Sequence, residues 1–153
     1  MFAFALSFTI ILITWVNHHA SLRLIDKSSN TLNYSNGFLL LTVVFLPLPT
    51  RLLGEYLLTD HSAPAVVLYE ATLALQAVGW ILLTGVALKE KLCKSETQAR
   101  TMRANNRLGY FAFLLYGLCS ITALWFPLAI AIVTTLFWIF WLIYGINIRH
   151  EEI

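Results

Sequence analysis

The sequence predicts an all-α membrane protein, a polytopic bundle of five transmembrane helices that forms a single domain over residues 1–153. Hydrophobic residues make up 59% of the chain and charged residues only 12%, and the mean hydropathy is +0.75. A soluble domain carries roughly 25% charged residues, so the low charge content excludes that class. The apolar residues also fall into five segments, which sets the expected number of helices.

Each apolar segment is close to the ~20 residues that a membrane-spanning helix needs. Pro64 lies in the first turn of the third segment, where a helix tolerates proline. Pro127 separates the last two segments with almost no loop, which predicts an antiparallel hairpin. The expected helices are residues 1–22, 37–58, 64–88, 108–126 and 128–146.

The basic residues predict the orientation in the membrane. Residues 89–107 contain six lysines and arginines against two glutamates, and short basic loops stay in the cytoplasm. We therefore expect this loop and the C-terminus on the cytoplasmic side, and the loop around Asp60 and His61 on the outer side. Binding of anionic lipid is the other interpretation of the basic loop.

This orientation places Met1 outside the membrane, with no basic residue in front of the first apolar segment. A signal peptide is not expected, because a charged start and a small-residue cleavage site are both missing. One more helix in front of Met1 would place the N-terminus inside. We therefore expect a six-helix unit from which the first helix is missing.

Polar side chains form one narrow stripe on the first predicted helix, where Ser7, Thr14, His18 and Ser21 follow a heptad-like spacing. Lipid cannot satisfy hydroxyl or imidazole groups, so the stripe is expected to face protein or water. Hydrogen bonds between helices are one role for it. For His18, a part in a permeation or gating network is equally open. No metal site is expected there, because no cysteine lies nearby.

Two further features interrupt the apolar segments. Pro47 and Pro49 remove two backbone donors in the middle of the second segment, so we expect them to kink or break that helix. Glu70 lies less than two turns inside the third segment and is a candidate intramembrane acid. Its carboxylate either snorkels to the outer interface or faces a pore.

Enzyme signatures are missing from the sequence. It contains no HExxH motif, no GxSxG motif and no glycine-rich phosphate loop. Cys93 and Cys119 belong to no metal or disulfide motif, and no basic and aromatic surface suggests nucleic acid. We expect neither an enzyme nor a nucleic-acid-binding protein, and no cofactor or metal.

Several short motifs follow one another along the chain. They are Trp15-x-x-His18-His19, Asn36, Phe45-Leu46-Pro47-x-Pro49-Thr50, Glu55-Tyr56 and Leu68-Tyr69. In this order and spacing the chain resembles the endolysosomal potassium channel family of the transmembrane protein 175 type and its bacterial relatives. The resemblance covers most of the chain and is densest between residues 4 and 69.

The resemblance implies a six-helix unit that forms tetramers in bacterial members and passes K+ in preference to Na+. In the family the first helix lines the pore with bulky apolar side chains and carries an Arg-x-x-x-Phe-Ser-Asp motif, which polar residues on the next two helices support. The matching support positions are Trp15, His18, His19 and Asn36. The chain contains neither that motif nor a TVGYG-like filter. Its first apolar segment corresponds to the family's second helix.

From this resemblance we expect a subunit of a homotetrameric potassium channel in a bacterial plasma membrane, surrounded by lipid. K+ would pass passively through a hydrophobic constriction, and protonation of a cytoplasm-facing histidine is one way to tune the support of the pore helix. A non-conducting accessory or binding subunit is one alternative. A small proton-coupled transporter that uses Glu70 and His18 is the other.

Overall fold

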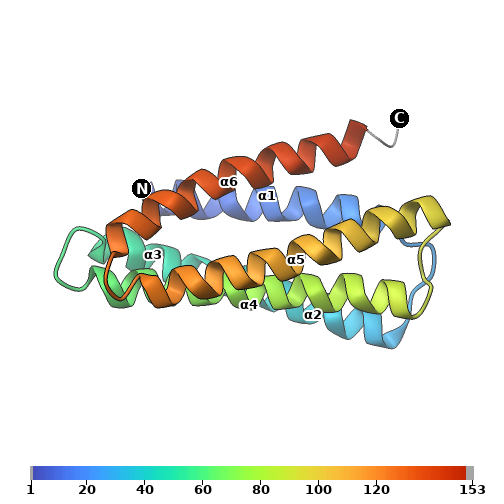
Figure 1. Ribbon diagram of the computed structural model, residues 1–153, viewed down its shortest axis with the longest axis horizontal. Helices are drawn as coiled ribbons and strands as arrows, with labels where there is room; N and C mark the ends of the chain where they lie inside the picture. The colour runs from blue at the N-terminus through green and yellow to red at the C-terminus, as the bar shows by residue number, and fades with distance from the viewer. Residues whose placement is uncertain (1, 151–153) are drawn as a thin grey trace.

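Helices that run roughly along the long axis of the molecule make up the computed structural model (Figure 1). It describes the backbone of residues 2–150 and the side chains of residues 7–143. The helices are α1 Phe2–Arg23, α2 Asn30–Phe45, α3 Pro47–Tyr56, α4 Ser62–Lys89, α5 Glu96–Thr122 and α6 Pro127–His150. All five predicted segments are therefore helical, and the second is divided into α2 and α3. The two termini lie toward opposite ends of the bundle (Figure 1).

Two helices begin earlier than expected. α2 begins at Asn30 instead of residue 37, and α5 begins at Glu96 instead of residue 108. At α2 the Ser29 hydroxyl caps the helix by accepting a hydrogen bond from the Leu32 amide at 3.1 Å. Hydropathy marks only the apolar part of a helix, so the polar first turns escaped prediction. The prediction of a basic loop over 89–107 was wrong, because most of these residues form the first turns of α5.

The second predicted segment is divided at Leu46, directly in front of Pro47. The Leu46 amide donates to the Val43 carbonyl at 3.2 Å, which tightens the end of α2. Thr50 compensates on the other side, where both its amide and its hydroxyl donate to the Leu46 carbonyl, at 3.2 and 2.8 Å. The two prolines thus lie in the first turn of a new helix, where their missing donors cost little.

α4 lies at the centre of the bundle and packs against α2, α3, α5 and α6. Gly79 allows a close approach of α2: a Cβ atom there would lie 3.0 Å from the Leu39 Cα atom. One core cluster surrounds Tyr69 and Leu73 and includes residues of α3 and α5. A second surrounds Leu83 nearer the opposite end of α4. α4 therefore connects both halves of the core.

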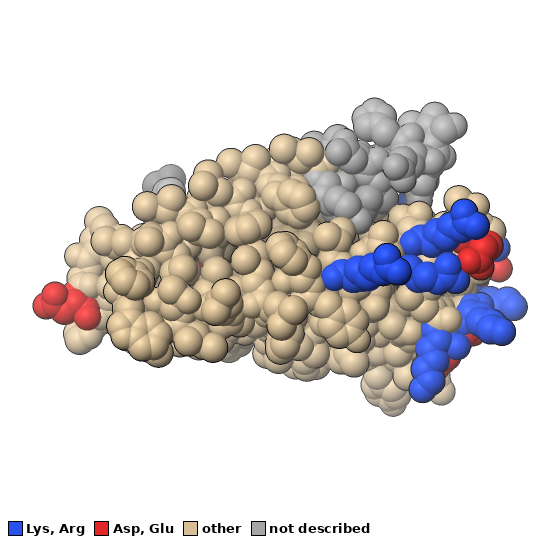
Figure 2. Space-filling model, viewed as in Figure 1, with Lys and Arg blue, Asp and Glu red and all other residues tan. Residues whose placement is uncertain are grey.

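The loops 24–29 and 90–95 lie together at one end of the bundle. The Asp26 amide donates to the Leu92 carbonyl at 2.9 Å, and the Lys94 amide donates to the Leu24 carbonyl at 3.1 Å. Lys and Arg side chains gather at this end with a few acidic ones among them, and the visible charge at the opposite tip is acidic (Figure 2). The charge asymmetry expected from the sequence is therefore present, although residues 149–153, expected on the same side, lie outside the described side chains.

Candidate pore-supporting site

His18 on α1 contacts side chains of two other helices, α2 and α4. Its Nε2 atom lies 2.6 Å from the Oδ1 atom of Asn36, which joins α1 to α2. The indole of Trp80 on α4 packs edge-on against the imidazole, with ring centroids 6.1 Å apart and planes at 66°. Two of the four expected support residues are thus in direct contact, although they are eighteen positions apart in the sequence.

Trp15 and His19 form a second contact on the same helix. Their rings are stacked, with centroids 5.4 Å apart and planes at 15°. The Trp15 side chain is 58% exposed, and His19 is exposed as well. The two neighbouring histidines therefore differ in surroundings: His18 contacts α2 and α4, whereas His19 packs on Trp15 at the surface of α1.

The polar stripe of α1 faces the bundle interior. Ser7, Thr14 and Ser21 are all buried. The Gln76 amide on α4 donates to the Thr14 hydroxyl at 3.2 Å. Near the basic end, the Asn105 amide on α5 donates to the Ser21 hydroxyl at 3.3 Å. Thr14 and Ser21 therefore join α1 to two other helices through side-chain hydrogen bonds, as the interhelical interpretation of the stripe expects.

A cavity of about 90 Å³ lies beside this stripe, between α1, α4, α5 and α6. Thr14, Asn17, Gln76 and Trp80 contribute to its lining. The Asn17 amide donates to the carbonyls of Ile13 and Trp141, at 3.1 and 3.4 Å, but its buried Oδ1 atom has no hydrogen-bond partner among the described residues. The space is large enough for a few water molecules, and Asn17 offers them an acceptor.

Glu70 is enclosed by the bundle. Its side chain has no exposed surface, and its Oε1 atom accepts a hydrogen bond from the Thr134 hydroxyl of α6 at 2.6 Å. The Oε2 atom is buried without a partner in the described part of the chain. The snorkelling interpretation of Glu70 was therefore wrong. Packing of α6 over the first turns of α4 holds the carboxyl group inside, where it joins the two helices.

Two aromatic pairs escaped the sequence analysis. Trp138 on α6 donates from its indole nitrogen to the Tyr69 hydroxyl of α4 at 3.1 Å. Trp141, one turn further along α6, donates to the Tyr116 hydroxyl of α5 at 2.8 Å. The available signal was the occurrence of Tyr and Trp inside apolar segments, because both need a hydrogen-bond partner when buried. Among the described residues, no group of three His, Cys, Asp or Glu could hold a metal ion.

Comparison with known proteins places these features in a family. The family described as endosomal/lysosomal potassium channel TMEM175 matches residues 1–47, which include His18 and Asn36. A potassium channel of Chamaesiphon minutus is 30% identical over 139 residues, which cover 88% of this chain and 68% of that protein. A potassium channel of Streptomyces collinus is 35% identical over 137 residues, which cover 84% of this chain and 64% of the relative.

The fold agrees with this assignment. The crystal structure of a lysosomal potassium-selective channel TMEM175 homolog from Chamaesiphon minutus superposes with a TM-score of 0.76 at 26% identity. The superposition covers 94% of this chain and 72% of that one. The prediction of an all-α membrane bundle is thereby confirmed, as is the resemblance noted in the sequence. The chain is an integral membrane protein that belongs to the TMEM175 potassium channel family.

Proposed function

We propose that this chain is a subunit of a potassium-permeable channel, through which K+ moves down its electrochemical gradient. The observation that carries the proposal is the likeness, over 88% of the chain, to a protein named a potassium channel. The superposition on a potassium-selective channel over 94% of the chain supports the same function. As the resemblance implies, four copies would surround one pore with a hydrophobic constriction.

Within this function, His18 and Asn36 are positioning residues. Their contact at 2.6 Å fixes the spacing of α1 and α2, and both lie in the segment that the family matches. Trp80 of α4 packs edge-on against the His18 imidazole and so adds a third helix to the site. We assign Trp15 and His19, stacked at the surface of α1, to contacts with a pore-lining element. The His18–Asn36 pair and the Trp15–His19 pair would together hold such an element in place.

The proposed location is a bacterial plasma membrane, with lipid around the apolar flank and the basic end in the cytoplasm. Support for the orientation comes from the position of the Lys and Arg side chains, which gather at the end formed by the loops 24–29 and 90–95 (Figure 2). Excess positive charge on one side of a membrane protein favours the cytoplasmic side. The C-terminus lies toward the same end (Figure 1).

Ion flux from liposomes tests the proposal. The purified chain, reconstituted in vesicles loaded with K+, should release K+ faster than protein-free vesicles, and faster than it releases Na+. His18→Ala should change this flux by about threefold, because a hydrogen bond between membrane helices contributes about 0.6 kcal/mol. His61→Ala is the matched control, because His61 is exposed at the opposite end of the bundle and should leave the flux unchanged.

The same assay separates the alternatives. K+ release no faster than from protein-free vesicles would contradict the channel function and favour an accessory subunit. Flux that saturates with K+ concentration and requires a proton gradient would identify a transporter. An unchanged flux in His18→Ala at every pH tested would remove His18 from the supporting site, while the channel function itself would stand.

A further inference from the structure

One face of α5 changes from basic to aromatic to aliphatic along its length. Arg100, Arg103 and Arg107 follow the i, i+3, i+7 spacing that places side chains on one side of a helix, and all three are exposed. This arrangement exists only because α5 begins at Glu96. If the segment were a loop, as the sequence suggested, the three guanidinium groups would have no common direction.

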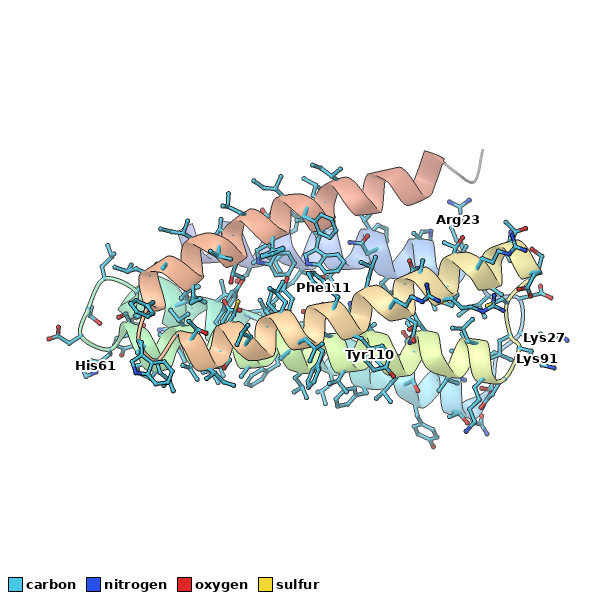
Figure 3. All side chains as sticks on the ribbon, in the orientation of Figure 1. Arg23, Lys27, His61, Lys91, Tyr110 and Phe111 are labelled. Atoms are coloured by element: carbon cyan, nitrogen blue, oxygen red, sulfur yellow. The ribbon has the colours of Figure 1, made fainter. Side chains whose placement is uncertain are left out.

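The same side of α5 continues into an exposed apolar strip. Tyr110 follows Arg107 by one turn and is 54% exposed, and Leu114, Leu118 and Ile121 are 69%, 64% and 59% exposed. Figure 3 shows Tyr110 part way along the flank of the bundle, away from the basic end marked by Lys27 and Lys91. From Arg107 to Ile121 a helix rises by about 21 Å, which exceeds half of the ~30 Å hydrocarbon core.

Positive charge at this end is in excess. The basic residues there are Arg23, Lys27, Lys89, Lys91, Lys94, Arg100, Arg103 and Arg107, against Asp26, Glu90 and Glu96. Arg103 pairs with Glu96 at 2.9 Å, but both side chains are more than half exposed, and such surface pairs contribute little. In the part of the chain that the structure describes, neither Arg100 nor Arg107 forms an ion pair.

We propose that this face of α5 binds one anionic phospholipid. The guanidinium groups of Arg100, Arg103 and Arg107 hold the phosphate and the negative headgroup, because a guanidinium fork matches phosphate oxygens. Tyr110 lies at the level where aromatic rings favour the membrane interface, and an acyl chain lies along Leu114 and Leu118. The proposal depends on the membrane location of the chain and is independent of ion conduction.

Charge complementarity selects this occupant over a second copy of the chain. Neighbouring subunits in a membrane have the same orientation, so the basic end of one copy would lie at the level of the basic end of the next. Three further arginines in that contact would add repulsion between like charges. An anionic lipid instead brings the opposite charge to the arginines, and its apolar chain covers the strip that follows them.

Native mass spectrometry of the full chain, purified and incubated with phosphatidylglycerol or phosphatidylcholine, tests the site. We expect phosphatidylglycerol to be retained and phosphatidylcholine to be lost on activation. Arg100→Gln/Arg103→Gln/Arg107→Gln should bind phosphatidylglycerol about a hundredfold more weakly, because each basic residue near an anionic headgroup contributes about 1 kcal/mol. The matched control is Lys89→Gln/Lys91→Gln/Lys94→Gln, which removes the same charge from the neighbouring loop region and should retain most of the lipid.

Equal losses in the two triple variants would overturn the proposal, because only a diffuse surface potential would then attract the lipid. Equal retention of both lipids by the unaltered chain would overturn it as well. The single variant Arg107→Gln serves if the triple arginine variant does not fold, and should retain less phosphatidylglycerol than Lys94→Gln. Disulfide cross-linking of Leu114→Cys in a Cys93→Ser chain into dimers would place a second copy on this face and also contradict the proposal.

Discussion

At the scale of single residues, the molecule places polar side chains in its apolar interior and pairs several of them across helices. Glu70 shows how much depends on one pair. Its carboxyl group is buried and accepts a hydrogen bond from Thr134 at 2.6 Å. This hydrogen bond joins α6 to α4 in the interior of the bundle. Removal of one partner of a buried hydrogen bond leaves the other unsatisfied, which costs more than the bond itself contributes.

Glu70→Ala is therefore expected to lower the free energy of unfolding by about 1–3 kcal/mol, because the Thr134 hydroxyl loses its acceptor and a cavity remains. Unfolding of the purified chain in detergent, followed by far-UV circular dichroism, measures the loss. Glu55→Ala is the control, since Glu55 is exposed. Glu70→Gln keeps an acceptor for Thr134 and should recover most of the stability. Equal stability of Glu70→Ala and the unaltered chain would contradict this role.

The residue scale also shows what the sequence could predict. The heptad-like spacing of Thr14 and Ser21 was sufficient to predict a stripe that faces protein, because spacing alone decides which residues share a helix face. Their partners Gln76 and Asn105 could not be predicted, since they belong to other helices. Which helix lies opposite a given face is decided by packing of the whole bundle.

At the scale of helices, α4 approaches its neighbours closely where glycine removes the side chain. A Cβ atom on Gly79 would lie 3.0 Å from both the Cα and the Cδ1 atom of Leu39. The Cα atom belongs to the backbone of α2 and cannot rotate away. Gly79 therefore sets the distance between α2 and α4, and with it the position of Asn36 three residues before Leu39.

Gly79→Ala should destabilise the chain by about 1–3 kcal/mol, the usual cost of overpacking. The unfolding assay measures this directly, and the His18 contact gives a second readout, because a displaced α2 also moves Asn36. Gly117→Ala is the matched control: Gly117 lies inside α5, and a Cβ atom there would have no neighbour within 4 Å. A similar loss in both variants would mean that helix packing at Gly79 is not the cause.

The starts of two helices differ from the sequence prediction. Hydropathy located the apolar part of each helix, because the requirement for apolar residues in lipid is strict. It did not locate the starts of α2 and α5, since Ser29 and Glu96 lie in polar sequence outside the apolar segments. Capping by Ser29 is a local signal that was available. The extension of α5 matters most, because it converts a basic loop into a helix face.

At the scale of the whole molecule, five crossings place the two termini toward opposite ends and leave one end basic. The charge difference between the two ends agrees with the sequence analysis, although Arg100, Arg103 and Arg107 lie on α5 and not in a loop. The backbone hydrogen bonds between the loops 24–29 and 90–95 could not be foreseen. They join the α1–α2 hairpin to the α4–α5 hairpin, so both hairpins form the basic end.

This polarity predicts which end a membrane-impermeant maleimide can reach in intact cells. Ser28 is exposed at the basic end and His61 at the opposite end, so Ser28→Cys and His61→Cys report the two sides. Both are made in a Cys93→Ser/Cys119→Ser chain. This background contains no native thiol. In the unaltered chain both thiols react slowly, since Cys119 is buried and burial raises the pKa of the Cys93 thiol, which lowers its reactive thiolate fraction.

We expect the reagent to label His61→Cys in intact cells and Ser28→Cys only after permeabilisation. The physical reason is that basic residues near the ends of membrane helices resist transfer across the membrane, and the Ser28 end carries most of them. The reverse pattern would contradict the cytoplasmic assignment of the basic end. Labelling of both variants in intact cells would mean that the chain inserts in two orientations, which the charge difference between its ends should prevent.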